Sequence, residues 1–125
     1  MIFLDTHVVV WLYAADLARI PSRARALLVE EDLLISPMVV LELEYLFETA
    51  RIKEHAEPIL DYLTRKTGLR TDTTTFFDLV KAALNERWTR DPFDRMITAQ
   101  ARFLDLPFLS KDVSIRAHYP RTIWN

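Results

Sequence analysis

The stretch IFLDTHVVVWLYAA, residues 2–15, joins a short apolar run to a longer segment that favours a helix. Residues 2–4 are typical of a buried strand, which ends at Asp5. Residues 6–15 predict a helix, although their β-branched side chains disfavour one slightly. The same order recurs at residues 33–50, where an apolar strand over 33–36 precedes a helix that Ser36 caps and Pro37 begins. The chain therefore alternates strands with helices from its start.

The rest of the chain continues this alternation without a linker or a low-complexity tract. We predict further helices over residues 22–31, 55–67, 74–88 and 92–104, and further strands over 69–71, 107–111 and 121–124. Gly68 stands where a C-capping glycine belongs. Short apolar strands between helices predict one α/β domain, residues 1–125, with a mostly parallel sheet covered on both faces. In such a sheet the chemistry lies at the carboxyl ends of the strands.

The composition excludes several classes of protein. The 125 residues are 50% hydrophobic and 27% charged, which is typical of a globular domain. The absence of cysteine excludes disulfides, thiolate metal sites and a cysteine nucleophile, and the single glycine, Gly68, excludes a glycine-rich phosphate loop. The net charge of −2 neither indicates nor excludes nucleic-acid binding. With no basic leader and no long apolar run, we expect a cytoplasmic protein.

Two aspartates follow predicted strands directly. Asp5 comes after the first strand, and Asp112 comes after the strand over residues 107–111. Because the carboxyl ends of parallel strands meet at one edge of the sheet, both side chains are candidates for a site there. Aspartate is also common in loops and helix caps, and that simpler reading stays open for each residue taken alone.

Two more acids fall on the inner sides of predicted helices. Winding the helix that begins at Pro37 places Glu42 in its apolar stripe, where an acid is costly unless it is paired or binds a metal. Pairing with a distant arginine is the alternative. In the helix that Asp91 caps, Asp94 occupies the third position, on the edge of the buried stripe. A carboxylate there also suits the helix dipole, but it faces the open end of the sheet.

These four acids predict a metal site. Clustered carboxylates repel one another, and a hard divalent cation relieves that repulsion. Oxygen ligands without cysteine or paired histidines indicate Mg²⁺ or Mn²⁺ rather than zinc. Such an ion activates water and neutralises a phosphodiester.

At these residues the sequence resembles the PIN-domain family, and more closely its VapC-like toxins of type II toxin–antitoxin pairs. The matching stretches are FLDTHVVVWL (3–12), ISPMVVLELEYLFE (35–48), DPFDRMITAQA (91–101) and LPFLSKD (106–112). They occur in the family's order and spacing, and the resemblance covers essentially the whole chain. It implies a parallel sheet of about five strands between helical layers.

The resemblance also implies a function. The family's acidic quartet falls on Asp5, Glu42, Asp94 and Asp112, and its hydroxyl positions fall on Thr6 and Ser110. The implied activity is a Mg²⁺- or Mn²⁺-dependent endoribonuclease, usually a homodimer neutralised by a VapB-type antitoxin. Asp5 and Asp94 would be metal ligands, Asp112 would complete the pocket, and Glu42 would bind the metal or orient the attacking water.

Some readings stay open. A PIN-like module that has lost catalysis and only binds RNA or protein is one alternative, and a Mg²⁺-dependent phosphoryl-transfer domain is another. The phosphatase pattern of the latter needs a second aspartate where His7 stands. Lys111 is read either as a solvated lysine or as a phosphate contact. Three arginines form either a basic rim for RNA or solvated faces; they are Arg87, Arg90 and Arg95. Extra apolar residues on the Glu42 helix suggest either a dimer or antitoxin contact or burial under a neighbouring helix; they are Val40, Leu43 and Phe47.

Overall fold

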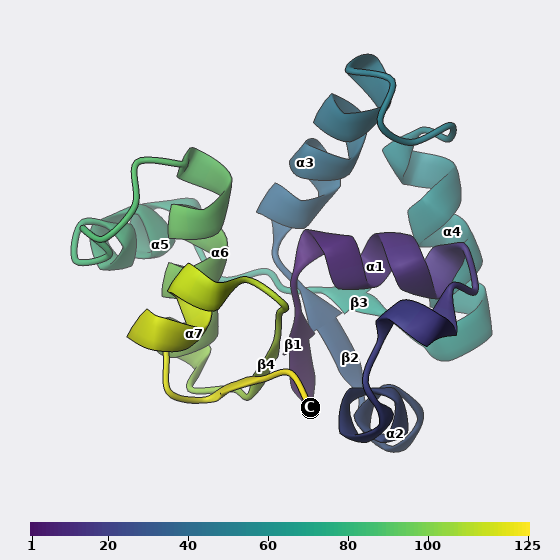
Figure 1. Cartoon of the computed structure of the whole chain (residues 1–125). Helices are drawn as coiled ribbons and strands as arrows, with labels where there is room; N and C mark the ends of the chain where they lie inside the picture. Colours follow the sequence, from purple (N-terminus) through teal and green to yellow (C-terminus); the bar gives the residue numbers. More distant parts are fainter.

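Five short strands form one parallel sheet at the centre of the computed structural model, which describes residues 1–125 (Figure 1). The strands are β1 (Ile2–Leu4), β2 (Leu33–Ile35), β3 (Arg70–Thr71), β4 (Phe108–Leu109) and β5 (Thr122–Ile123). All five lie within the predicted strands, so the predicted α/β class and parallel sheet are confirmed.

The strand order, β3-β2-β1-β4-β5, determines where a site can form. Phe3 of β1 pairs in register with Leu34 on one side and with Phe108 on the other. The chain builds from β1 to β3 in one direction, and then crosses back to place β4 and β5 on the other side of β1. The carboxyl ends of β1 and β4 are therefore the switch point at which an open α/β sheet leaves a crevice.

Helices cover both sides of the sheet. They are α1 (Thr6–Tyr13), α2 (Ser22–Glu30), α3 (Pro37–Glu48), α4 (Ala56–Thr67), α5 (Phe76–Ala83), α6 (Pro92–Leu104) and α7 (Val113–His118), with a 3₁₀ turn, η1, at Leu17–Arg19. Figure 1 shows α1, α2 and α4 on one side and α5, α6 and α7 on the other. Helix α3 contacts α1, α4 and α6, so it spans the gap between the two groups.

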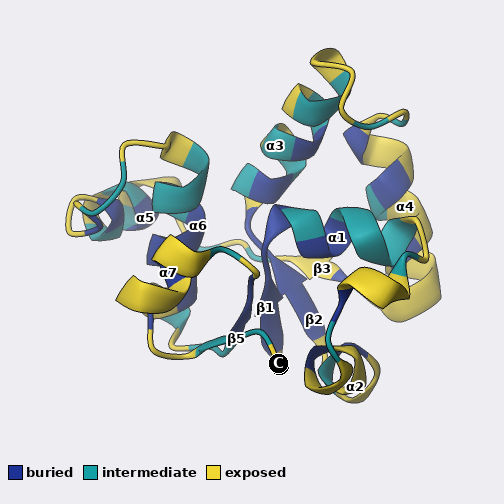
Figure 2. Ribbon diagram, in the orientation of Figure 1, coloured by how far each residue is buried: buried dark blue, intermediate teal, exposed yellow.

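The core lies along the strands and the helix faces that meet them (Figure 2). Every residue of β1, β2 and β4 is buried, as a parallel sheet covered on both faces requires. Helix α6 contributes Ile97 and Ala101, both fully buried. Gly68 ends α4 with a φ of 74°, in the left-handed region, so its predicted role as a C-cap is confirmed.

The structure differs from the predicted elements at two places. The helix predicted over residues 74–88 ends at Ala83. Arg95 donates a hydrogen bond from Nε to the Ala83 carbonyl oxygen at 2.8 Å, so a side chain satisfies the end of α5. Helix α7 was not predicted, because its six residues are too few to display a period. None of the helices has the length and apolar character that crossing a membrane requires.

Candidate active site

Asp5 lies at the carboxyl end of β1, where it also caps α1. Its Oδ1 accepts a hydrogen bond from the backbone N–H of Thr6 at 2.8 Å. Its Oδ2 accepts one from the Ser110 hydroxyl, which follows β4, at 2.6 Å. Asp5 and Ser110 are both buried. The pairing of β1 with β4 thus joins two predicted site residues that are 105 positions apart in the chain.

Asp112 lies two residues after Ser110 and caps α7. Its Oδ1 accepts a hydrogen bond from the backbone N–H of Ile115 at 2.9 Å, and its own N–H donates to the Ser110 hydroxyl at 3.1 Å. The Ser110 hydroxyl therefore donates to Asp5 and accepts from the Asp112 backbone. One small side chain fixes the two acids relative to each other.

Glu42 reaches the same end of the sheet from α3. The Ser36 hydroxyl caps that helix by accepting from the Met38 N–H at 3.0 Å, and Pro37 begins it. Glu42 Oε1 accepts a hydrogen bond of 2.5 Å from the Thr6 hydroxyl. Burial raises the pKa of Glu42, the Thr6 hydrogen bond lowers it, and the charges of Asp5 and Asp91 raise it again.

Asp94 lies in the first turn of α6. Asp91 caps this helix by accepting from the Asp94 backbone N–H at 3.0 Å, so the side chain of Asp94 is free of capping. Burial, and to a smaller extent the charges of Asp5, Asp91, Asp112 and Glu42, together raise the pKa of Asp94 to about 7. Acids from several elements therefore disfavour the ionised form of Asp94 in addition to its burial.

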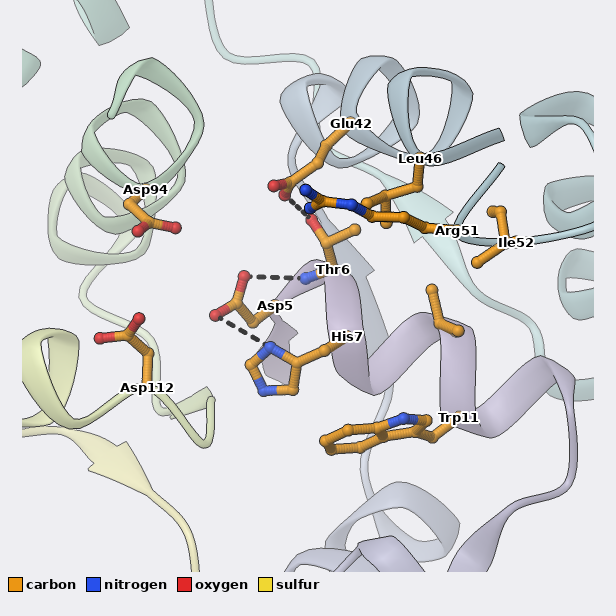
Figure 3. Close-up of a pocket in the computed structure, with 11 residues that line it drawn as sticks. Asp5, Thr6, His7, Trp11, Glu42, Leu46, Arg51, Ile52, Asp94 and Asp112 are labelled. Carbon is orange, nitrogen blue, oxygen red and sulfur yellow. Dashed lines mark hydrogen bonds and ion pairs between the residues drawn. The ribbon is translucent and has the colours of Figure 1, made fainter. Parts of the chain in front are cut away.

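These acids line one pocket, called here the acidic pocket. Figure 3 shows the carboxylates of Asp5, Glu42, Asp94 and Asp112 directed toward a common space. The pocket has a volume of about 290 Å³ and is lined by Asp5, Thr6, His7, Val10, Trp11, Glu42, Leu46, Arg51, Ile52, Asp94 and Asp112. All four predicted acids and Thr6 therefore lie on its wall, with Ser110 behind Asp5.

The donor set fits a hard divalent cation. No three acidic or histidine side chains are gathered closely enough to form a preassembled metal site. The pocket nevertheless presents only oxygen donors from its acids, and Asp94 has a raised pKa with like charges around it. A cation among these carboxylates would replace mutual repulsion with attraction, which is the arrangement that Mg²⁺ and Mn²⁺ favour.

Two further residues of the pocket were not predicted from the sequence. The Ala50 backbone has a φ of 60° and the Arg51 N–H donates to the Leu46 carbonyl oxygen at 2.8 Å, which turns the chain back at the end of α3. Figure 3 shows the Arg51 guanidinium directed toward Glu42 across this turn. Arg51 is the one lysine or arginine on the wall of the acidic pocket.

His7 is the other residue whose environment the sequence did not reveal. Its Nε2 accepts a hydrogen bond from the Lys111 backbone N–H at 2.8 Å, and its Nδ1 lies 3.6 Å from Asp5 Oδ2. Burial lowers the pKa of His7 and outweighs the opposing charges of Asp5 and Asp112. His7 thus joins the loop after β4 to the start of α1 as a neutral ring.

The structure also changes the interpretation of surface residues. Glu44, two residues after Glu42 on α3, accepts hydrogen bonds from the Ala56 N–H at 3.0 Å and from His55 Nδ1 at 2.9 Å, so it caps α4 from α3. Leu43 is fully buried, which favours burial over a dimer contact. The arginines suggested for a basic rim donate to backbone carbonyl oxygens near the end of α5, not to the pocket; they are Arg87, Arg90 and Arg95.

Comparisons with known proteins agree with this architecture. The family model for the PIN domain matches residues 2–119. A solved structure described as VapBC2 from Rickettsia felis bound to a DNA fragment from their promoter superposes with a TM-score of 0.66. The identity is 19%, over 100% of both chains, so this likeness is one of fold. No curated protein matches the sequence.

Proposed function

The chain belongs to the PIN-domain family, and from that membership and the acidic pocket we propose that it is a metal-dependent endoribonuclease. The observation that carries the proposal is the raised pKa of Asp94 inside a pocket walled by three further carboxylates. Repulsion between carboxylates at the switch point of the sheet is costly unless a cation offsets it. Family membership supports RNA as the substrate.

Each pocket residue has a proposed role. Asp5 and Asp94 would hold a divalent ion, Mg²⁺ or Mn²⁺, and Asp112 would complete the pocket. When bound, such an ion lowers the pKa of water and neutralises the charge of a phosphodiester. The Thr6 hydroxyl fixes Glu42 Oε1 and leaves Oε2 to bind the metal or to orient the attacking water. Ser110 holds Asp5 in place through its hydroxyl hydrogen bond.

Arg51 supplies the positive charge that an RNA phosphate requires. It stands across the acidic pocket from Asp94 and makes no ion pair with any acid (Figure 3). A guanidinium in that place can bind a non-bridging phosphate oxygen and offset the approach of an anion to four acids. Arg51→Gln is therefore expected to raise KM more than it lowers kcat.

The proposed biological role is that of the toxin in a VapBC-type pair. The fold likeness to VapBC2 and the resemblance of the sequence to VapC-like toxins support a VapB-type antitoxin as partner. A homodimer is proposed as well, because α3 and α5 expose large apolar side chains on a chain of this size. On these two helices and at the end of α5 they are Leu41, Tyr45, Phe76, Phe77 and Leu84. The reading frame next to the gene tests the antitoxin directly.

The catalytic proposal is tested with purified protein and oligoribonucleotides, both single-stranded and structured. Cleavage should require Mg²⁺ or Mn²⁺ and stop when excess chelator is added. Asp5→Asn and Asp94→Asn should each lower turnover by orders of magnitude while the fold is retained. RNA binding without metal-dependent cleavage would show instead a module that has lost catalysis. Cleavage that persists in chelator, or near-normal cleavage by either variant, would contradict the proposal.

A further inference from the structure

A second cavity opens beside the acidic pocket. It has a volume of about 390 Å³ and is lined by His7, Trp11, Lys111 and Asp112. Three of these residues, His7, Trp11 and Asp112, also line the acidic pocket, so the two spaces are adjacent. This second space is called here the side cavity. A polymer whose backbone crosses the acids would have its next unit at this place.

An aromatic platform forms the wall of the side cavity. The Trp11 ring lies below His7 in Figure 3, with the ring centroids 5.0 Å apart. Trp124 supports both rings, at 6.0 Å from Trp11 and 5.9 Å from His7. Trp11 is only half-buried, so part of its ring is open to solvent and to a ligand. His7 and Trp124 thus hold the Trp11 ring in position beside the site.

Positive charge accompanies this platform. Lys111 Nζ lies 5.8 Å from the centroid of the Trp11 ring, and the Arg19 guanidinium carbon lies 5.7 Å from it. Arg19 is already paired with Asp16, whose carboxylate is 2.7 Å from Arg19 Nε. Lys111 makes no ion pair and is exposed. It is therefore the cation of the side cavity that is free to bind an anion.

The position of Lys111 is fixed by its backbone. Its N–H donates to His7 Nε2, and the His7 ring packs against Trp11 at a tilt of 56°. Ser110 and Asp112, on either side of it, are tied to the acidic pocket. The exposed lysine side chain therefore starts from a backbone that is held at the boundary between the two cavities.

We propose that the side cavity binds a nucleotide next to the scissile phosphate, with its base stacked on Trp11 and its phosphate at Lys111. The inference rests on the proposed ribonuclease function. It identifies the bound RNA as unpaired, because a base in a duplex has no free face to stack on a side chain. An aromatic platform beside a cation is how proteins hold single-stranded nucleic acid without reading its sequence. The side cavity is also within the size range of small-molecule sites, about 300–1,000 Å³.

The test measures binding separately from cleavage. The full chain carrying Asp94→Asn, with Mg²⁺ present, is titrated with a fluorescein-labelled single-stranded oligoribonucleotide. In this background Trp11→Leu should weaken binding about 5- to 150-fold, the range expected for loss of one stacked base. Trp11→Phe should retain most of the affinity. Lys111→Gln should reduce the slope of log Kd against log salt by about 0.7, the value for one phosphate contact on a single strand.

Matched variants and a second readout accompany the binding curves. Lys66 also lies near an aromatic ring, 6.0 Å from the Tyr62 centroid, but on α4, and Lys66→Gln should leave the salt slope unchanged. RNA should quench tryptophan fluorescence, and Trp11→Phe should abolish that quenching. Trp88→Phe should preserve it, because Trp88 stacks on His118 away from the pocket. The quenching result stands even if Trp11→Leu fails to fold.

The outcomes are distinct. If the parent chain cleaves RNA with metal, and the Trp11 and Lys111 variants bind and quench as the parent does, the side cavity is not a nucleotide subsite. If the parent neither binds nor cleaves RNA, the proposed function fails and the subsite with it. If the Trp11 and Lys111 variants keep RNA affinity but lose a copurifying protein partner, the occupant is a protein, and the inference is overturned.

Discussion

Replacing Asp94 by Asn tests the electrostatics of the acidic pocket without using catalysis. Asn keeps the shape of the side chain and removes its charge. Raising a pKa from 3.8 to about 7 corresponds to about 4 kcal/mol for a fully shielded group. Asp94 is only partly buried, and its place in the first turn of α6 favours the ionised form by about 0.3–1 kcal/mol. Solvent screening reduces the expected effect to about 1–2 kcal/mol.

The sign of the effect follows from the direction of the pKa change. Because the folded-state pKa of Asp94 is higher than the unfolded one, its protonated form favours folding, and that stability is lost as pH rises from about 4 to 7. At pH 8 without metal, Asp94→Asn should melt about 3–10 °C above wild type. At pH 5 the two proteins should differ much less. Added Mg²⁺ at pH 8 should stabilise wild type more than the variant.

The assay is thermal unfolding in excess chelator between pH 5 and pH 8, followed by circular dichroism. Asp61→Asn, an exposed acid on α4 outside the pocket, is the matched control and should follow wild type across the range. A difference between Asp94→Asn and wild type that does not grow with pH would refute the reasoning. A variant that is less stable than wild type at pH 8 would also refute it. Ionised Asp94 would then stabilise the fold, which is inconsistent with a raised pKa.

Three further predictions follow from individual contacts. Glu44→Gln weakens the hydrogen bonds to the Ala56 N–H and to His55, so it should lower Tm at neutral pH by a few degrees and leave RNA cleavage unchanged. Asp112→Asn should keep the cap of α7 and Asp112→Ala should lose about 1 kcal/mol of unfolding free energy, measured by urea titration, while both lose activity equally. The isolated chain should be a dimer by light scattering at high micromolar concentration, and Leu41→Glu should make it monomeric; a monomeric parent would contradict the apolar-face argument.

The parts of the site that the sequence predicts are those fixed by local rules. Apolar runs locate β1 and β4, and the acids that follow them lie at strand ends because parallel strands share one edge. Helical winding from Pro37 places Glu42 on the inner side of α3, where the Thr6 hydroxyl meets it. The predicted element boundaries agree within a few residues, except at α5 and α7.

The parts that the sequence does not predict depend on contacts between distant segments. Arg51 enters the acidic pocket because Ala50 adopts a positive φ, which is uncommon for alanine and is not predicted from the sequence. Glu44 caps α4 only because α3 and α4 pack side by side. Helix α5 ends early because Arg95, on the next helix, reaches its last carbonyl oxygens. In each case the decisive partner is set by the fold and not by spacing along the chain.

Two of the four acids both cap a helix and line the acidic pocket. Asp5 and Asp112 each accept a backbone N–H through Oδ1, at the start of α1 and α7, and this fixes the carboxylate at the edge of the pocket. The second oxygen of Asp5 is held in turn by the Ser110 hydroxyl. Asp94 has no such arrangement, because Asp91 caps α6 in its place. Its carboxylate is therefore held among like charges without a donor of its own. Burial first, and then these charges, raise the pKa of Asp94 to about 7, so a cation would act strongly there.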